Sequence, residues 1–194
     1  MWSKDIYNHL STGKAKQEDT APKKLIEPKI LTNCEELGKN YVSLLGKCYY
    51  VEGTEMNFTA ASKNCEEKFG SFGKGKLFEP MNKQVNEKVI KAARKIDIRS
   101  LRFFLGIMDA DSSNNWTYHS DGKPVTWTNW DSDQPNNGRL CCNGEDCTVG
   151  GFRIHDYKWH DDSCYDSHPS ICEHSMVPIS KIKGEQKFER NIAI

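Results

Sequence analysis

Eight cysteines constrain the folding of this 194-residue chain more than any other feature. They are Cys34, Cys48, Cys65, Cys141, Cys142, Cys147, Cys164 and Cys172. An even number spread over one stretch, with no repeated C-x-x-C pair, is typical of disulfides rather than of zinc ligands. Because disulfides persist in oxidising compartments, we expect a secreted or extracellular protein. No signal peptide begins at Met1, so we expect the natural N-terminus to lie upstream.

The composition argues against two classes of protein. Lys+Arg and Asp+Glu both number 27, so the net charge is zero, and no basic surplus suggests nucleic acid as a partner. No stretch approaches the roughly 20 apolar residues that a membrane helix needs. The hydrophobic fraction of 37% predicts a thin core that depends on covalent cross-links.

The chain divides into three parts. Residues 1–33 are polar and lysine-rich without a sustained apolar period, so we expect a flexible stalk, with a short helix against the domain as the alternative. Residues 34–174 contain every cysteine and are expected to form one domain. Residues 175–194 mix lysine, glutamate and apolar residues, and we expect a loosely ordered tail.

Local patterns within the domain predict an α+β fold. Residues 47–51 have the composition of a strand, and 102–107 that of a buried strand. Helices are expected after Asn57 and Asn82, with Asn57 as N-cap. Residues 109–168 are expected to be an irregular, functional loop region. The helix faces expected to point inward are Phe58, Ala61, Cys65 and Phe69, and then Val85, Val89, Ala92 and Ile96.

Several short motifs follow one another in an order typical of one family. They are Cys65 on the first helix, Phe104-Leu105-Gly106-Ile107, Trp127-Thr128-Asn129-Trp130, Gln134-Pro135-Asn136, Glu145-Asp146-Cys147, Trp159-His160-Asp161 and Ser170-Ile171-Cys172-Glu173. With these motifs, the segment from about Cys34 to Glu173 resembles a C-type lectin-like domain in its long form. The resemblance implies two helices, small antiparallel sheets and a long calcium-binding loop, braced by disulfides.

The same resemblance implies how six of the cysteines pair. The implied disulfides are Cys34–Cys48, Cys65–Cys172 and Cys147–Cys164. Cys141 and Cys142 are then left over. A vicinal Cys141–Cys142 disulfide is our first expectation, and an interchain bond or two free thiols are the alternatives.

The resemblance also implies a calcium ion that binds sugar directly. Calcium takes about 6–8 oxygen ligands. Side-chain carbonyls would come from Gln134 and Asn136, turned toward one ion by a cis Gln134–Pro135 bond, and carboxylates from Glu145 and Asp161. In the family, vicinal hydroxyls of the sugar complete the coordination and hydrogen-bond to the same four side chains.

Two positions depart from the family's usual motifs. His160 stands where asparagine is usual. An imidazole nitrogen is a poor calcium ligand, so His160 is a doubtful ligand, and a water molecule could take its place in the coordination of the ion. Gln134 replaces the glutamate of mannose-type sites, so only Glu145 and Asp161 bring formal charge, and fewer charges weaken a calcium site. The Gln-Pro-Asn motif lies between the mannose and galactose patterns; without a following tryptophan, it slightly favours mannose or fucose.

An auxiliary calcium position is conceivable at Asp109 and Asp146, together with Glu145. Ser113 and Asn137 stand where further acidic ligands would be expected. Carboxylates in such a loop also have a simpler interpretation as solvated turn formers, which we prefer for Asp109 taken alone. A zinc site is not favoured, because no pair of histidines has the spacing of a helical zinc motif.

Two sequons, at Asn57 and Asn115, predict N-glycosylation. Asn115 is the better acceptor, because Asn57 is also the expected N-cap. The sequence contains no nucleophile elbow, phosphate loop or Ser/His/Asp order, so an enzyme is not expected.

The resulting hypothesis is a calcium-dependent lectin that recognises glycans on cells or microbes. The rival hypothesis is a lectin-like module that binds a protein partner, or a mineral or ice surface, without calcium-dependent sugar binding. An oligomer would raise avidity for glycans and is compatible with an interchain bond at Cys141 or Cys142.

Overall fold

A computed structural model describes residues 33–97, 99, 102–138, 144–152 and 157–176. The predicted stalk and most of the predicted tail, as well as Cys141 and Cys142, lie outside these residues. The elements in chain order are η1 (Glu35–Leu37), β1 (Tyr41–Leu44), β2 (Lys47–Met56), α1 (Phe58–Glu67), η2 (Gly70–Phe72), β3 (Lys76–Leu77), α2 (Lys83–Ile96), β4 (Phe103–Met108), β5 (Thr117–Tyr118), β6 (Cys147–Phe152), β7 (Lys158–Asp162) and β8 (His168–Ser175).

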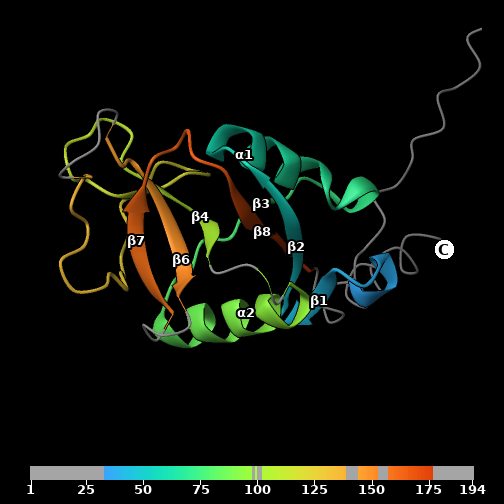
Figure 1. The fold of residues 1–194 in the computed structure, drawn as a ribbon. Helices are drawn as coiled ribbons and strands as arrows, with labels where there is room; N and C mark the ends of the chain where they lie inside the picture. Colours follow the sequence, from blue (N-terminus) through green and yellow to red (C-terminus); the bar gives the residue numbers. More distant parts are fainter. Residues whose placement is uncertain (1–32, 98, 100–101, 139–143, 153–156, 177–194) are drawn as a thin grey trace, which may run out of the picture.

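The strands form one sheet in the order β1-β2-β8-β4-β6-β7, with β3 added to β8 and β5 added to β4. All the pairs are antiparallel except β4 with β8, which run parallel where Phe104 faces Ser170. The expected α+β fold with two helices is confirmed, but the sheet is mixed and single rather than several small antiparallel ones. Helices α1 and α2 lie on opposite sides of it (Figure 1).

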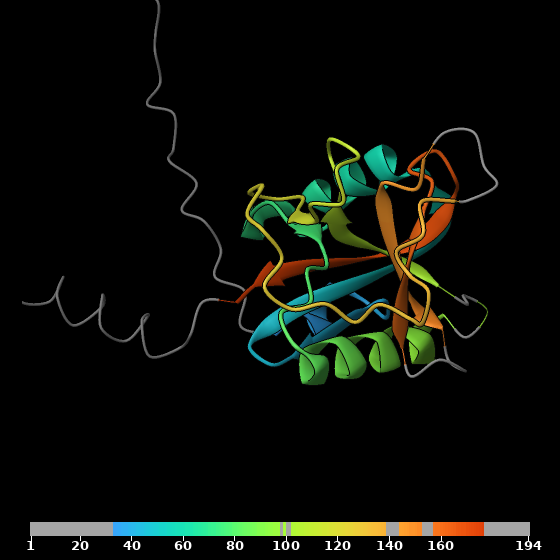
Figure 2. The ribbon, with the colours of Figure 1, turned by 90° about the vertical axis from the view of Figure 1, so that its left-hand side faces the viewer.

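The segment 109–168 was expected to be irregular, and this expectation is wrong in part. It contains β5, β6 and β7. Strand β6 contains the strand-favouring Thr148 and Val149, but two glycines follow them; it lies between β4 and β7 and pairs with both. The part that is irregular, between β5 and β6, winds across one end of the molecule (Figure 2).

Strand β4 is the centre of the core because both of its faces are buried. Phe104 points into a cluster with Phe58, Cys65 and other residues of the α1 side. Phe103, Leu105 and Ile107 belong to a second cluster on the α2 side. Successive side chains of a strand point to opposite faces, and so a continuous apolar run is what a strand between two helices requires.

Both helices begin where they were expected, after Asn57 and after Asn82, and both asparagines are N-caps, although only Asn57 was predicted to be one. The side chain of Asn57 accepts a hydrogen bond from the Ala60 N–H at 2.9 Å, and that of Asn82 from the Val85 N–H at 3.0 Å. The predicted inward face of α1 is confirmed: Phe58, Ala61, Cys65 and Phe69 are all buried.

The predicted inward face of α2 is confirmed for three of its four residues, because Val89 is buried and Val85 and Ile96 are partly buried and pack against the core. The prediction missed three further buried residues of this helix, Asn86, Ile90 and Ala93. Asn86 escapes a search for apolar periodicity because it is polar. It is buried nevertheless, because its carboxamide accepts a hydrogen bond from the Trp159 indole at 2.9 Å and donates one to the Tyr157 carbonyl at 3.1 Å.

Three disulfides form in the pairs that the family resemblance implies. Cys34–Cys48 joins η1 to β2 with 5.7 Å between the Cα atoms, and Cys65–Cys172 joins α1 to β8 at 5.2 Å. Cys147–Cys164 connects β6 to the segment after β7 at 5.1 Å. The last of these braces the end of the molecule that holds the irregular loop.

Gly106 lets a neighbouring segment cross β4 at close range. Its N–H donates to the Phe78 carbonyl at 2.8 Å. A Cβ at this position would lie 2.9 Å from the Leu77 carbonyl oxygen and 2.8 Å from the Glu79 Cγ. One of these atoms belongs to the backbone, and so the clash cannot be relieved by a side-chain rotation alone.

We therefore expect Gly106→Ala to destabilise the domain by about 1–3 kcal/mol, the usual effect of overpacking a core. Urea unfolding followed by circular dichroism measures this change. Lys91→Ala, at an exposed position of α2, is the control and should change stability by less than about 0.5 kcal/mol. Equal stability of Gly106→Ala and the wild type would contradict the packing described here.

Candidate functional site

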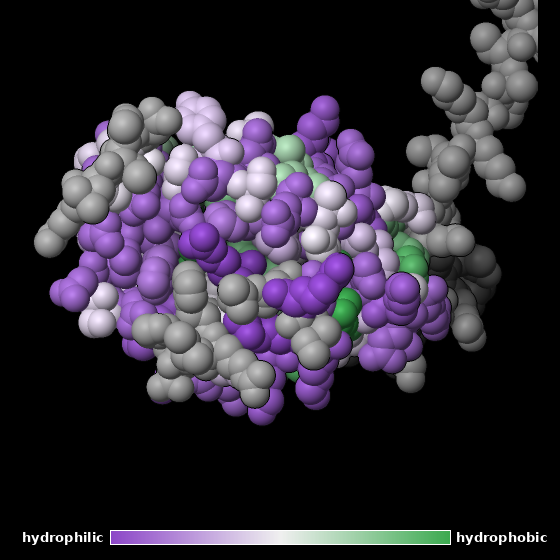
Figure 3. Space-filling view, viewed as in Figure 1, coloured by the Kyte–Doolittle hydropathy of each residue, from purple (hydrophilic) through white to green (hydrophobic). Residues whose placement is uncertain are grey.

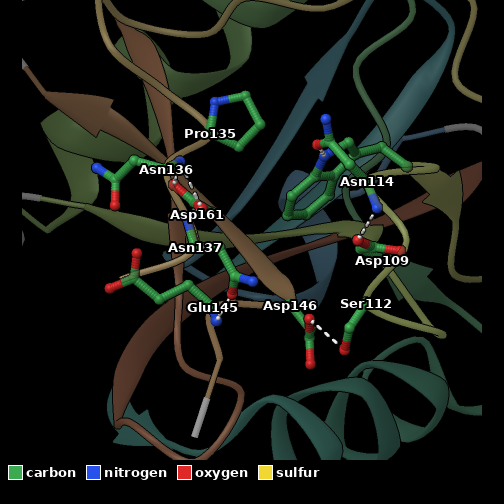
Figure 4. Close-up of a pocket in the computed structure, with 10 residues that line it drawn as sticks. Asp109, Ser112, Asn114, Pro135, Asn136, Asn137, Glu145, Asp146 and Asp161 are labelled. Carbon is green, nitrogen blue, oxygen red and sulfur yellow. Dashed lines mark hydrogen bonds between the residues drawn. The ribbon is translucent and has the colours of Figure 1, made fainter. Parts of the chain in front are cut away.

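The carboxylate of Asp161 holds the loop that precedes it in the sequence by some 25 residues. It accepts hydrogen bonds from the Asn136 N–H, at 3.1 and 2.9 Å to its two oxygens, and from the Asn137 N–H at 2.6 Å (Figure 4). Asp161 is 4% exposed and lies on β7, opposite Thr148 of β6. The sheet thus fixes the position of the carboxylate, and the carboxylate fixes the position of the loop. The Gln134–Pro135 bond in this loop is cis, as expected.

A cavity of about 300 Å³ opens beside this contact. Three of the four predicted calcium ligands line it: Asn136, Glu145 and Asp161. The side chains of Asn136 and Glu145 point toward the same side (Figure 4). The complete lining is Asp109, Ser112, Asn114, Trp116, Pro135, Asn136, Asn137, Glu145, Asp146 and Asp161.

Gln134, the fourth predicted ligand, is not among the lining residues, but its side-chain oxygen, Oε1, is buried without a hydrogen-bond donor among the described residues. A buried oxygen without a donor costs about 1–3 kcal/mol. A cation beside this oxygen would remove that cost, so the residue fits the calcium ligand set.

Glu145 carries a charge that its surroundings disfavour. Partial burial, and then the negative charge of Asp161, raise the pKa of the Glu145 carboxyl. The backbone leaves room for this side chain at Gly138, which has φ of 53° and where a Cβ would lie 3.0 Å from the Glu145 carboxyl carbon. Two carboxylates that repel each other in one cavity are the arrangement that a divalent cation stabilises.

His160, the doubtful ligand, is turned toward another residue. Its Nε2 lies 3.2 Å from the Asp131 carboxylate, and it does not line the cavity. His160 precedes Asp161 on β7, and alternate side chains of a strand point to opposite faces. We therefore leave His160 out of the ligand set proposed below.

The two residues of the auxiliary position, Asp109 and Asp146, do line the cavity. Asp109 accepts hydrogen bonds from the Ser113 and Asn114 N–H groups at 3.2 and 2.6 Å. Asp146 accepts one from the Ser112 hydroxyl at 3.0 Å. Asp109 therefore acts as the turn former that the simpler interpretation anticipates, whereas Asp146 joins two segments that are 34 residues apart. Each carboxylate keeps lone pairs with which it could bind a cation.

A second group of metal-ligand types was not singled out in the sequence. Ligand atoms of Asp162, Asp166 and His168 lie within 4.8 Å of one another and could hold a metal ion. The Asp162 carboxylate, however, already accepts hydrogen bonds from Arg102 at 2.8 Å and His168 at 3.0 Å. Burial alone would raise the pKa of Asp162, but His168 and Arg102 hold it below its usual value. We interpret the group as an ion-pair network, because Arg102 already supplies the positive charge.

The two sequon asparagines are exposed. Asn57 uses its Oδ1 as the cap of α1, and Asn115 donates from its Nδ2 to the Ser113 hydroxyl at 2.7 Å. Glycosylation of either stays a prediction. Among the described residues, no helix combines the length and the apolar character needed to cross a membrane.

A family model described as Lectin C-type domain matches residues 54–174, more than half of the chain. The chain belongs to this family. A perlucin-like protein of Mytilus galloprovincialis is 28% identical over 132 residues, which cover 68% of this chain and 76% of the relative. An alpha-N-acetylgalactosamine-specific lectin of Patiria pectinifera is 28% identical over 136 residues, with the same two coverages.

A likeness to solved structures supports the fold of this C-type lectin domain. The carbohydrate-recognition domain of a human scavenger receptor C-type lectin superposes with a TM-score of 0.60 at 24% identity, over 71% of this chain and 98% of that one. The chain therefore has the fold of a C-type lectin domain, and its family is one of lectin domains rather than of enzymes. Its disulfides are typical of extracellular proteins.

Because the pKa of Glu145 is raised, we expect its replacement to change thermal stability in opposite directions without and with calcium. When the pKa of a carboxyl group is higher in the folded than in the unfolded protein, the free energy of unfolding falls as the pH rises through these pKa values. At neutral pH the ionised Glu145 therefore destabilises the fold. In the presence of a chelator, Glu145→Gln should therefore unfold at a slightly higher temperature than the wild type. With millimolar calcium the order should reverse, because the variant loses a charged ligand.

Thermal unfolding at neutral pH, with and without calcium, measures both effects. Glu87→Gln, on α2 and away from the cavity, is the control and should behave alike in both buffers. The same order of wild type and Glu145→Gln in both buffers would show that Glu145 is not a calcium ligand.

Proposed function

We propose that this domain is a calcium-dependent lectin, with Gln134, Asn136, Glu145 and Asp161 as ligands of both the ion and the sugar. One observation carries the proposal: the carboxylates of Glu145 and Asp161 and the carboxamide of Asn136 line one cavity. Gln134, next to the lining residue Pro135, adds a buried carboxamide oxygen that has no donor among the described residues. Asp161 and Glu145 bring two negative charges, which match one divalent cation. Calcium would supply Lewis-acid binding of two sugar hydroxyls.

Each of the four residues has its own part in this proposal. Asp161 is buried and holds the loop, so it would bind the ion while positioning Asn136. Glu145 reaches the cavity from the segment before β6, and calcium would relieve its repulsion with Asp161. Gln134 would contribute the neutral oxygen that has no hydrogen-bond donor among the residues that the structure describes. A site with two charged ligands should be of the weaker, extracellular kind, with a Kd of about 10⁻⁴–10⁻³ M.

For the sugar we propose a slight preference for mannose or fucose. The reason is that no tryptophan directly follows the Gln-Pro-Asn motif. One relative is named as specific for alpha-N-acetylgalactosamine, which supports the galactose class instead. Both classes therefore belong in the test.

A second calcium ion at Asp109 and Asp146 is part of the proposal as well, and the number of calcium ions bound at saturation measures it.

We expect the wild-type domain to be retained on mannose- or galactose-agarose in calcium and to elute with a chelator. Saturating calcium at about 10–100 times the Kd should also stabilise the fold by about 1.4–2.7 kcal/mol. Asp161→Asn should lose both effects, because it removes a ligand charge while an oxygen remains to accept the loop N–H groups. Column retention and thermal unfolding are the two measurements.

Asp121→Asn is the matched control, because Asp121 is an exposed acid paired with Lys123 and lies outside the cavity. It should behave as the wild type does. A wild type that is retained on neither resin, and that calcium does not stabilise, would overturn the proposal. That outcome would favour the rival hypothesis of a module that binds a protein partner, or a mineral or ice surface, without calcium.

A further inference from the structure

The exposed side of helix α2 carries a row of lysines that no acid balances. Lys88, Lys91 and Lys95 are all exposed, and their spacing of three and then four residues places them on one side of the helix. At a rise of about 1.5 Å per residue, this lysine row spans about 10 Å. None of the three forms an ion pair with any residue that the structure describes.

The acids closest in sequence are engaged with other cations. Glu87 is the one acidic residue within α2, and its carboxylate lies 3.7 Å from the Lys83 ammonium. Asp97, the C-cap of the helix, lies 3.9 Å from the Arg99 guanidinium. Both acids therefore leave the charge of the lysine row uncompensated.

The charges of this neutral chain are thus separated along its fold. Residues 83–102 carry seven basic and two acidic side chains, whereas residues 109–162, which include the proposed calcium ligands, carry four basic and ten acidic ones. Helix α1, on the other side of the sheet, exposes Lys63 together with Glu66 and Glu67. The uniform charge of the lysine row is therefore a property of α2 and not of helix surfaces in this domain generally.

Helix stability does not explain the lysine row. A positive charge is favourable in the last turn of a helix, where Lys95 lies, but Lys88 and Lys91 lie further from this end. Like charges three or four residues apart destabilise a helix, and the row contains one pair of each spacing. An anionic partner that binds along the row would remove this repulsion.

The surroundings of the lysine row indicate the kind of anion. The large apolar side chains that are exposed among the described residues are Leu45, Met81 and Tyr165, and none of them lies on α2. The face drawn in Figure 3 is mostly hydrophilic, and apolar residues appear on it only in small patches. A membrane surface would need apolar side chains that insert, and a single-stranded nucleic acid would need aromatic rings for its bases.

A linear polyanion that is bound by charge alone needs neither feature. The three disulfides are typical of extracellular proteins, and sulfated polysaccharides are linear polyanions of the extracellular space. Their sulfate groups repeat along the chain, as the lysines do along the helix. A sulfated polysaccharide therefore matches the sign, the shape and the polarity of this surface.

We propose that the exposed face of α2 binds a sulfated polysaccharide through Lys88, Lys91 and Lys95, and that it does so without calcium. The three ammonium groups would pair with successive sulfate groups of one polysaccharide chain. None of these lysines lines the cavity assigned to calcium, so the two sites are separate. The polysaccharide site needs no metal ion and does not depend on the proposed lectin function.

Binding of the full chain to immobilised heparin, in the presence of a chelator, tests this site. In the triple variant Lys88→Gln, Lys91→Gln and Lys95→Gln, the affinity at about 0.15 M salt should be about 10–100-fold lower than in the wild type. The slope of log K against log salt should also fall in magnitude by about 2–3, because each lysine that pairs with a polyanion releases roughly 0.7–0.9 counterions. Surface plasmon resonance over a series of salt concentrations measures both quantities.

The matched control is a second triple variant, Lys39→Gln, Lys63→Gln and Lys123→Gln. It removes three exposed lysines from other parts of the domain and changes the net charge by the same amount. Its affinity for heparin should stay within about threefold of the wild type, because only long-range attraction is reduced. Desulfated heparin should bind the wild type at least about tenfold more weakly than heparin does. Circular dichroism checks that both variants are folded.

The outcomes that would overturn the site are distinct. They include a wild type that does not bind heparin, and equal affinities of the two triple variants. A single-stranded oligonucleotide that binds as tightly as heparin would show that the face is not adapted to sulfated polysaccharides. Self-association of the wild type that the α2 variant abolishes, without binding to heparin, would identify the partner as the acidic end of a second copy. Failure of calcium-dependent sugar binding would overturn the proposed function and leave this site intact.

Discussion

The three hydrogen bonds that Asp161 accepts from the backbone of Asn136 and Asn137 hold the site together. They join a loop with almost no regular structure to β7, the edge strand of the sheet. A carboxylate has lone pairs for about four such contacts, so one that binds two N–H groups can still bind a cation. The same residue is therefore both the anchor of the loop and a charged ligand in the proposed calcium site.

The position of Asp161 depends in turn on the core. Two residues earlier on β7, Trp159 is fully buried, and its indole donates to Asn86 of α2. Cys147–Cys164 links the neighbouring strand β6 to the segment that follows β7. Asp161 is thus held by a cross-linked part of the fold. The loop at Asn136 and Asn137 therefore needs little stability of its own, because Asp161 fixes its backbone.

The sequence predicts those features that depend on local patterns or on ordered motifs. The helix starts after Asn57 and Asn82, the buried strand and the three disulfides belong to this group. Strands β6 and β7 were missed because two glycines interrupt the pattern of β6 and because β7 is mostly polar and charged. Pairing with neighbouring strands holds both in the sheet. Asn86 was missed on the inward face of α2 because a buried hydrogen bond, invisible in the sequence, holds this polar residue in the core.

The candidate site was predictable to the same degree and for similar reasons. Three predicted ligands line one cavity because motif order places them, whereas the orientation of His160 depends on a distant contact with Asp131. The central claim is that the cavity holds calcium, and calorimetric titration of the full chain with Ca²⁺ tests it most directly. The account predicts saturable binding with a Kd of about 10⁻⁴–10⁻³ M. The absence of saturable binding at millimolar calcium would contradict it.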